Sequence, residues 1–172
     1  MWKNNIRKNT ILFSLITLSL ISLSVGAGAQ EEHMTAKLCS LHPKPIIEVA
    51  LNGKPAYFLL DTGSDINVVS IKGAKKYNFG TMSRKNRQHF VSTANGLLSD
   101  YMHVYNMDMT LGGIRLEGSF VSLDLGVIAD SIRQKCGITI DGVLGSGTMK
   151  THRFVIDYNR EQVAFIGSKR LP

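Results

Sequence analysis

The stretch FLLDTGSD, Phe58 to Asp65, places two carboxylates, two hydroxyls and a glycine directly after an apolar run. An apolar strand that ends at Asp61 and turns at Gly63 would hold the Asp61 carboxylate at the floor of a cleft. A charge is costly in such a place unless something neutralises it. Because strongly perturbed carboxyl groups concentrate at catalytic sites, the pattern favours Asp61 as a reacting group.

The residues around Asp61 suit peptide hydrolysis. That reaction needs a base to activate water and an acid to protonate the leaving nitrogen, and two carboxyl groups that share one proton supply both. Gly63 would let the backbone turn sharply beside the carboxylate. Ser64 could donate a hydrogen bond to the ionised carboxylate.

The segment around Asp61 supplies one of the two carboxyl groups that this reaction needs, so the second has to come from another part of the protein. Asp65 lies past the turn, Asp141 precedes a glycine but lacks the Thr-Gly context, and Asp157 has neither a glycine turn nor a suitable lead-in. We therefore expect a two-fold homodimer in which each chain contributes Asp61 at the axis. A single chain would then be inactive.

Short apolar runs separated by turn residues indicate a mainly β fold, because no segment has a long, clean amphipathic helical period. Asn52-Gly53 is a strong hairpin signal. The expected strands are Ile46–Leu51, Ala56–Leu60, Val68–Ile71, Phe90–Thr93, Tyr101–Tyr105, Met107–Leu111, Arg115–Leu125, Gly137–Leu144, Arg153–Tyr158 and Gln162–Ile166. A weak helical turn is expected at Gly73–Tyr77, and one short C-terminal helix at Ser146–His152.

Three stretches together resemble the retropepsin-like single-domain aspartic peptidases of the exported bacterial type: FLLDTGSD, DGVLG at Asp141–Gly145, and FVIDYNREQVAFI. The resemblance implies a closed β-barrel equivalent to half of an acid protease, and an aspartic endopeptidase that cuts extended peptides. It makes Asp61 catalytic, and it implies that Thr62 bonds across to the partner chain. The supporting residues that it implies are Thr62, Gly63 and Ser64, with Val143, Leu144 and Gly145 as the second glycine motif.

The resemblance also implies a flap, a mobile hairpin that closes over the substrate. The matching segment carries Asn95 and Gly96 near its tip, so these two residues are expected to touch the substrate. Asp65 matches an acidic residue that holds the substrate backbone in retroviral relatives. Those relatives have an Arg after the second glycine, where this chain has Ser146. An ordinary surface hairpin and a solvated turn carboxylate are the alternatives.

The N-terminus predicts export. Three basic residues precede the apolar run Ile11–Val25, which is shorter than the ~20 residues that span a bilayer, and Ala27-Gly28-Ala29 suits signal cleavage. The protein would be periplasmic or extracellular, or anchored in the inner membrane if the signal is not cleaved. We expect a signal peptide at 1–29, an N-terminal extension at 30–45 and the peptidase domain at 46–172.

Charge and residue spacing limit the classes of partner and cofactor that the sequence indicates. Loss of residues 1–29, with three basic and no acidic side chains, lowers the formal charge from +7 to +4, and no basic stripe interleaved with aromatic residues indicates nucleic acid. No histidine or cysteine spacing matches a zinc site, and no cofactor is expected. Cys39 and Cys136 could form a disulfide in an oxidising compartment, with two free, buried thiols as the alternative.

Two other functions remain open. A non-catalytic periplasmic peptide-binding module could use the same fold, although it would have no need to keep Asp61, Thr62, Gly63 and Ser64 intact. A monomeric accessory domain could hold Asp61 as a buried structural carboxylate. That role would require a cationic or hydrogen-bonding partner within the chain, and no candidate stands out in the sequence.

Overall fold

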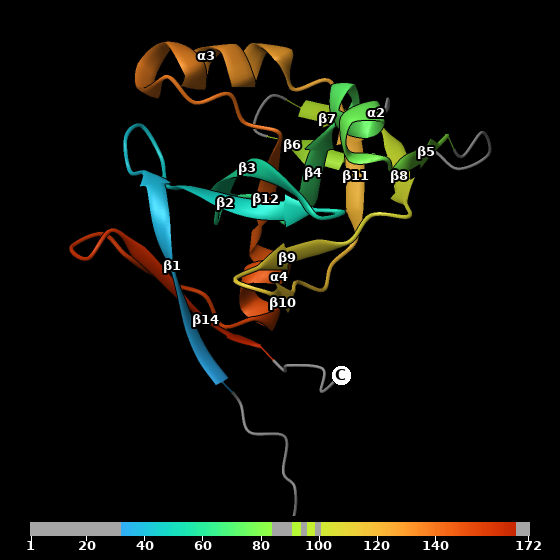
Figure 1. The fold of residues 1–172 in the computed structure, drawn as a ribbon. Helices are drawn as coiled ribbons and strands as arrows, with labels where there is room; N and C mark the ends of the chain where they lie inside the picture. The colour runs from blue at the N-terminus through green and yellow to red at the C-terminus, as the bar shows by residue number, and fades with distance from the viewer. Residues whose placement is uncertain (1–31, 84–90, 94–95, 99–100, 168–172) are drawn as a thin grey trace, which may run out of the picture. The chain divides into compact units, whose positions relative to one another are not determined.

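The computed structural model describes residues 32–83, 91–93, 96–98 and 101–167, which belong to one structural unit (Figure 1). The first hairpin forms as the sequence predicts. Strands β2 (Ile46–Leu51) and β3 (Lys54–Asp61) pair antiparallel across Asn52 and Gly53, whose φ angles are 46° and 79°. The Asn52 side chain also accepts the backbone N–H of Asp108 at 2.7 Å, which fixes the turn against a distant loop.

A mixed sheet extends on both sides of β3. Its other strands are β1 Glu32–Ser40, β4 Asn67–Ser70, β5 Gly80–Met82, β8 Met102–Tyr105, β9 Met109–Leu111, β10 Ile114–Arg115, β11 Phe120–Leu123, β12 Gly142–Gly145, β13 Val155–Asp157 and β14 Gln162–Gly167. The strand order is β13-β14-β1-β2-β3-β12-β4-β11-β8-β5, and the β9–β10 hairpin pairs with β2. Strand β12 runs parallel to β3 and antiparallel to β4, while β11 runs parallel to β4.

The two faces of this sheet support separate apolar clusters. Successive side chains of a strand point to opposite faces, so Phe58 and Leu60 enter the larger cluster, which we call the main core. Leu59 enters a smaller one, and Asp61 lies on the same face as Leu59. The smaller cluster, which we call the second cluster, contains the buried residues Ile46, Leu59, Val68, Leu125, Ile132, Ile140 and Val143.

The longest helix of the described residues, α3 (Gly126–Cys136), corrects the sequence-based expectation of a strand to Leu125 with no helix after it. Exposed apolar side chains at Val127 and Ile128 obscure the helical period, because they lie outside the packed face. Gly137, in the left-handed conformation with φ 76°, ends the helix. The packed face consists of Leu125, Ala129, Ile132 and Cys136, which do follow helical spacing.

The hairpin that the sequence predicted as a flap has a different second strand. β6 (Val91–Thr93) pairs antiparallel with β7 (Gly96–Leu98) in a separate two-stranded sheet. The predicted second arm is β8, which pairs with β5 and β11 instead. β7 is closer to β6 in the sequence than β8 is, so pairing β6 with β7 closes a shorter loop and costs less entropy. Gly96 opens β7 beside the turn, whereas Asn95 lies outside the described residues.

Residues 30–45, expected as an extension, contribute β1 to the sheet. Its antiparallel partners are β14 along most of its length and β2 at its end. Cys39 on β1 and Cys136 on α3 are free thiols. The disulfide that the sequence allowed is therefore not formed in the structure, and Cys39 is exposed rather than buried.

The fold is mainly β with a few short helices, as the sequence predicts. Helix α4 (Ser146–Thr151) is the expected C-terminal helix. The 3-10 helix η1 (Ile71–Gly73) and helix α2 (Ala74–Tyr77) form the expected helical turn. Within the described ranges, none of the helices has the length and apolar character needed to span a bilayer.

Candidate active site

Asp61 is the last residue of β3 and lies opposite Gly145 of the parallel strand β12. Its side chain is 32% exposed, although Leu59 and Leu60 just before it are buried. The apolar lead-in therefore ends at a carboxylate that reaches the surface of a single chain. Thr62 and Gly63 after it are exposed as well.

Backbone N–H groups shape the loop after Asp61. The Gly63 N–H donates to Asp61 Oδ1 at 3.1 Å, and the Ser64 N–H donates to the Asp61 carbonyl at 3.1 Å. The Ser64 hydroxyl donates to the Ile66 carbonyl at 2.8 Å. This corrects the expectation that Ser64 would bind the carboxylate, because the turn brings the hydroxyl to a nearer acceptor two residues on.

Gly145 of the second glycine motif touches the backbone of this loop. A Cβ atom at Gly145 would lie 2.4 Å from the Ile66 carbonyl oxygen and 2.8 Å from the Ser64 carbonyl oxygen. The N–H of Ser146 donates to the same Ser64 carbonyl at 2.7 Å. Only a residue without a side chain allows this approach, which explains why the motif needs glycine after Val143 and Leu144.

A buried polar network that the sequence analysis did not identify holds the same region. Asn67 Oδ1 accepts the Gly145 N–H at 2.9 Å, and Asn67 Nδ2 donates to Thr148 Oγ1 at 2.8 Å. Thr148 in turn donates to the carbonyl of Glu117 at 3.1 Å. Asn67 and Thr148 are both buried. An asparagine at the start of an apolar strand was the available signal, because a buried amide requires partners.

Lys44 is the second residue that the sequence analysis missed. Its Nζ lies 3.8 Å from Asp61 Oδ2, with the two side chains 53% and 32% exposed. Asp61 thus has a cationic neighbour within the chain, which the accessory-domain hypothesis required. The exposure of both groups nevertheless argues against a buried structural carboxylate, because water screens such a pair strongly.

The other acidic candidates lie apart from Asp61. Asp65 is exposed, and its carboxylate accepts a hydrogen bond from the Ser146 hydroxyl at 3.4 Å, at the position where the retroviral relatives have an arginine. Asp141 precedes β12 and accepts the Tyr57 N–H at 3.1 Å. Since Tyr57 is four residues before Asp61 on β3, Asp141 lies about 13 Å along the strand from the candidate site.

Structural roles account for Asp141 and Asp157. Lys76 Nζ lies 3.4 Å from Asp141 Oδ1. Burial raises the pKa of the neighbouring Tyr77 phenol, and the Asp141 carboxylate raises it further. Asp157 Oδ1 accepts the N–H groups of Asn159 and Arg160, both at 2.9 Å, and so closes the β13–β14 turn. These bonds lower the pKa of Asp157, the Arg160 N–H most of all.

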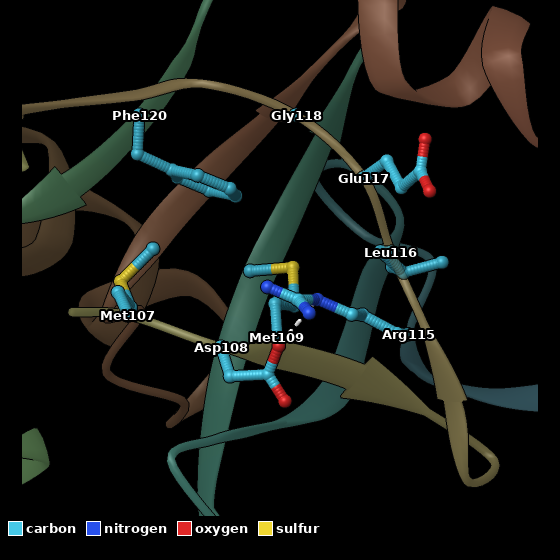
Figure 2. Close-up of a pocket in the computed structure, with 8 residues that line it drawn as sticks. All are labelled: Met107, Asp108, Met109, Arg115, Leu116, Glu117, Gly118 and Phe120. Atoms are coloured by element: carbon cyan, nitrogen blue, oxygen red, sulfur yellow. Dashed lines mark ion pairs between the residues drawn. The ribbon is translucent and has the colours of Figure 1, made fainter. Parts of the chain in front are cut away.

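Two cavities in the part of the chain that the structure describes are lined by residues other than Asp61. One, of about 330 Å³, is bounded by Met107, Met109 and Phe120, with an ion pair of 2.6 Å between Arg115 Nε and Asp108 Oδ1 (Figure 2). The other, of about 350 Å³, is lined by Tyr57, Lys76, Gly137, Ile138, Thr139 and Asp141. In the part of the chain that the structure describes, no group of three or more potential ligand side chains could hold a metal ion.

Comparison with known proteins identifies relatives of this arrangement. A family model for aspartyl proteases matches residues 47–148, which include Asp61 and the second glycine motif. The chain is similar to a retropepsin-like aspartic protease from Rickettsia conorii, at 12% identity and a TM-score of 0.50, over 83% of this chain and 95% of that one. No curated protein matches the chain.

Two further solved structures show lower similarity. One is the retroviral protease-like domain of Ddi1 from Leishmania major, at 13% identity and a TM-score of 0.47, over 80% of this chain and 95% of that one. The other is the EIAV protease complexed with the inhibitor HBY-793, at 18% identity and a TM-score of 0.43, over 65% and 90%. Since the family model spans more than half of the sequence, the chain belongs to the aspartyl protease family, with a retropepsin-like fold.

Proposed function

We propose that the protein is an exported aspartic endopeptidase in which Asp61 of two identical chains forms the catalytic dyad. The observation that carries the proposal is the position of Asp61 at the end of a buried strand, where its carboxylate is oriented by the Gly63 N–H and remains 32% exposed. A single chain thus presents half of a dyad on an open face. A second copy would supply the other half.

The two carboxyl groups would share one proton. The ionised carboxylate takes a proton from water as the water oxygen attacks the scissile carbonyl carbon, and the protonated carboxyl gives its proton to the carbonyl oxygen. The carboxyl that took the proton from water then passes it to the amide nitrogen as the C–N bond breaks, while the other carboxylate takes back a proton from a hydroxyl of the tetrahedral intermediate. Such a pair titrates as a unit. The role of Gly63 is to fix the rotamer of each carboxyl, so that the two face each other at the axis.

The exposure of Thr62 supports a second chain at this face. Thr62 and Gly63 are exposed although they lie in the loop between β3 and β4, directly after the buried residues Leu59 and Leu60 and the half-buried Asp61. A two-fold axis beside Asp61 would bring the same residues of both chains together, because an isologous interface pairs each patch with itself. Thr62 would then hold the partner's loop by hydrogen bonds and give the site rigidity.

Extended peptide segments are the proposed substrate class. The β6–β7 hairpin is the candidate flap, and strand edges beside the cleft recognise substrate backbone through main-chain hydrogen bonds. The N-terminal sequence features support a periplasmic or extracellular location. The substrates would then be proteins or peptides of that compartment.

Mixing experiments with an inactive chain test the proposal directly. We expect the purified chain to cut a mixed peptide library between about pH 4 and pH 7, and Asp61→Asn to cut nothing while remaining folded and dimeric. Equal mixing of the two, after exchange of subunits, should reduce activity per wild-type chain to about half, because half of the wild-type chains acquire an inactive partner. Asp141→Asn is the matched control and should leave activity intact.

Two results would count against the proposed dyad. Full activity per wild-type chain in the equilibrated mixture would show that one chain suffices. If the wild-type protein is folded and dimeric but cuts nothing, a peptide-binding module becomes the better description. Equilibrium sedimentation of each sample distinguishes these outcomes from a failure of the chains to associate.

A further inference from the structure

We propose that His152 is a positioning residue for the Asp61 carboxylate, and that it performs this role only while its imidazole is neutral. It acts through the backbone of Glu117, and protonation of this one buried ring lowers the catalytic rate. The inference rests on the proposed peptidase function for the reaction that is affected. It adds a titratable group outside the dyad to the control of that reaction.

Main-chain groups satisfy both ring nitrogens of His152, which follows α4 and is 7% exposed. Its Nε2 accepts the Glu117 N–H at 2.9 Å, and its Nδ1 lies 3.2 Å from the Ile166 carbonyl oxygen. A backbone N–H only donates and a carbonyl only accepts, so Nε2 carries no proton and Nδ1 carries one. The structure thus requires one tautomer of the neutral ring.

The backbone of Glu117 is bonded twice to one face of α4. Thr148 and His152 are four residues apart, and the His152 N–H donates to the Thr148 carbonyl at 3.1 Å. Thr148 Oγ1 donates to the Glu117 carbonyl at 3.1 Å, while His152 accepts the N–H of the same residue. Figure 2 shows Glu117 and Gly118 on the connection that leads to Phe120. The two side chains therefore fix this connection against the helix.

The residues that follow Glu117 leave no free space beside this face. A Cβ atom at Gly118 would lie 2.7 Å from Asn67 Nδ2 and closer still to Thr148 Oγ1. The next residue, Ser119, accepts Asn67 Nδ2 at its carbonyl at 3.0 Å. A shift of this connection therefore disturbs both Asn67 and Thr148.

Asn67 carries such a disturbance to the strand beside the candidate catalytic residue. Its Nδ2 donates to Thr148 Oγ1 at 2.8 Å, and its Oδ1 accepts the Gly145 N–H at 2.9 Å. Gly145 lies opposite Asp61 in the parallel pair of β12 and β3. A continuous set of hydrogen bonds thus connects His152 with the strand pair that holds Asp61.

Protonation of His152 breaks the first bond of this set. An imidazolium has an N–H at both nitrogens and accepts at neither, so Nε2 would face the Glu117 N–H with a second donor. Turning the ring over does not help, because both of its nitrogens then donate. Either the connection or the ring has to move. Histidines change charge between about pH 5 and pH 8, which overlaps the range proposed for the dyad.

Charged neighbours do not replace these bonds. The charged or titratable side chains on the described segments around His152 are exposed: Glu117 on the connection, His33 opposite Ile166 on β1, and Lys150 and Arg153 close by in the sequence. Water screens charges at such positions strongly. The ring nitrogens bond backbone atoms, so the hydrogen bonds decide which form of the ring the folded chain accommodates.

Two substitutions separate the two bonds of the ring. A glutamine amide oxygen can replace Nε2 as acceptor of the Glu117 N–H and does not titrate, whereas an asparagine amide reaches only the position of Nδ1. A shift of about 1 Å at a catalytic group costs about 100-fold in rate, and we expect a smaller shift and about tenfold here. The kcat of His152→Gln should match wild type within about twofold at pH 7 and exceed it by about tenfold near pH 4.5.

His152→Asn should lower kcat by about tenfold already at pH 7 and leave KM nearly unchanged, because the residue is buried within its own chain. His33→Gln, at an exposed position of β1, is the matched control and should follow wild type at every pH. Parallel pH profiles for wild type and His152→Gln would overturn the proposal. So would equal kcat values for His152→Gln and His152→Asn at pH 7.

NMR of the Asp61→Asn chain separates this inference from the proposed function, because that chain has no titrating dyad and needs no activity. At pH 7 we expect the Nδ1–H tautomer of His152 and a scalar coupling between its Nε2 and the Glu117 amide nitrogen. On acidification the coupling should vanish, and the Gly145 amide signal should move with the same midpoint as the imidazole signals.

The same spectra give the opposing results. An Nε2–H tautomer, or a Gly145 signal that does not follow the titration of His152, would refute the connection between this ring and the catalytic strand pair. If the wild-type chain is folded and dimeric but cuts no peptide, the proposed function fails and the NMR titration alone decides the inference. It also decides if the His152 variants do not fold, since it uses the native histidine.

Discussion

The contact between Gly145 and the loop after Asp61 makes the sharpest prediction, because replacement by alanine meets backbone atoms. The added Cβ would lie 2.4 Å from the Ile66 carbonyl oxygen, where ordinary contact begins near 3.4 Å. Either β12 or the loop must move by about 1 Å. Gly145 has an ordinary φ of −89°, so space and not backbone conformation causes the conflict.

The cost can be worked out from the bonds that this shift disturbs. Overpacking of a buried site costs about 1–3 kcal/mol. The Ser146 N–H bond to the Ser64 carbonyl, 2.7 Å in length, weakens as well, at about 1 kcal/mol. We therefore expect Gly145→Ala to lower the free energy of unfolding by about 2–4 kcal/mol. For a domain of this size that is a decrease in Tm of roughly 10 °C.

Gly147→Ala is the matched control. Its Cβ would lie 3.5 Å from the Asp65 carbonyl oxygen, an ordinary contact, and the residue is exposed in α4. It should be neutral or stabilising by up to about 1 kcal/mol through helix propensity. Urea unfolding followed by circular dichroism measures both variants. A Gly145→Ala chain within about 0.5 kcal/mol of wild type would refute the close approach.

Activity provides a second measurement on Gly145→Ala. A displacement of about 1 Å at a catalytic group can reduce the rate about 100-fold. The residual folded enzyme should therefore lose far more activity than stability. Comparable activity in Gly145→Ala and Gly147→Ala, at a temperature where both are folded, would show that this loop does not position the reacting carboxylate.

Three further predictions concern single side chains. Asn67→Ala should lower the unfolding free energy by about 2–4 kcal/mol in urea titrations, because it leaves the Gly145 N–H and its other buried partners unpaired. Lys44→Met should change it by less than about 0.5 kcal/mol, because the ion pair with Asp61 is exposed, and 1 M salt should abolish any difference. Burial raises the pKa of Tyr77, so this phenol ionises at a lower pH in the unfolded chain than in the folded one. The unfolding free energy of the wild type should therefore fall as the pH rises above about 10, and Tyr77→Phe should make this fall smaller.

Local patterns in the sequence predict the elements whose chemistry is contained in a few neighbouring residues. The Asn52-Gly53 turn, the strand into Asp61 and helix α4 follow from turn preferences and apolar runs. The partners of Asp61 do not follow in this way. Lys44 reaches the carboxylate from the connection between β1 and β2, and a contact across that distance has no periodicity in the sequence.

The errors have equally physical causes. In α3 the helical face of Leu125, Ala129, Ile132 and Cys136 is present, but Val127 and Ile128 on the exposed side give the segment a strand-like run of apolar residues. The flap hairpin was assigned the wrong second strand because two apolar segments follow Gly96. Only the sheet register shows that the later one pairs with β5 and β11.

The sheet also explains why an apolar run leads directly into a carboxylate. A strand covered on both faces reads as a continuous apolar segment, because neither face needs polar residues. Phe58 and Leu60 enter the main core, while Leu59 enters the second cluster on the face of Asp61. The sequence FLLD therefore describes a strand that is covered on both faces up to Leu60, and Asp61, 32% exposed, stands where that cover ends.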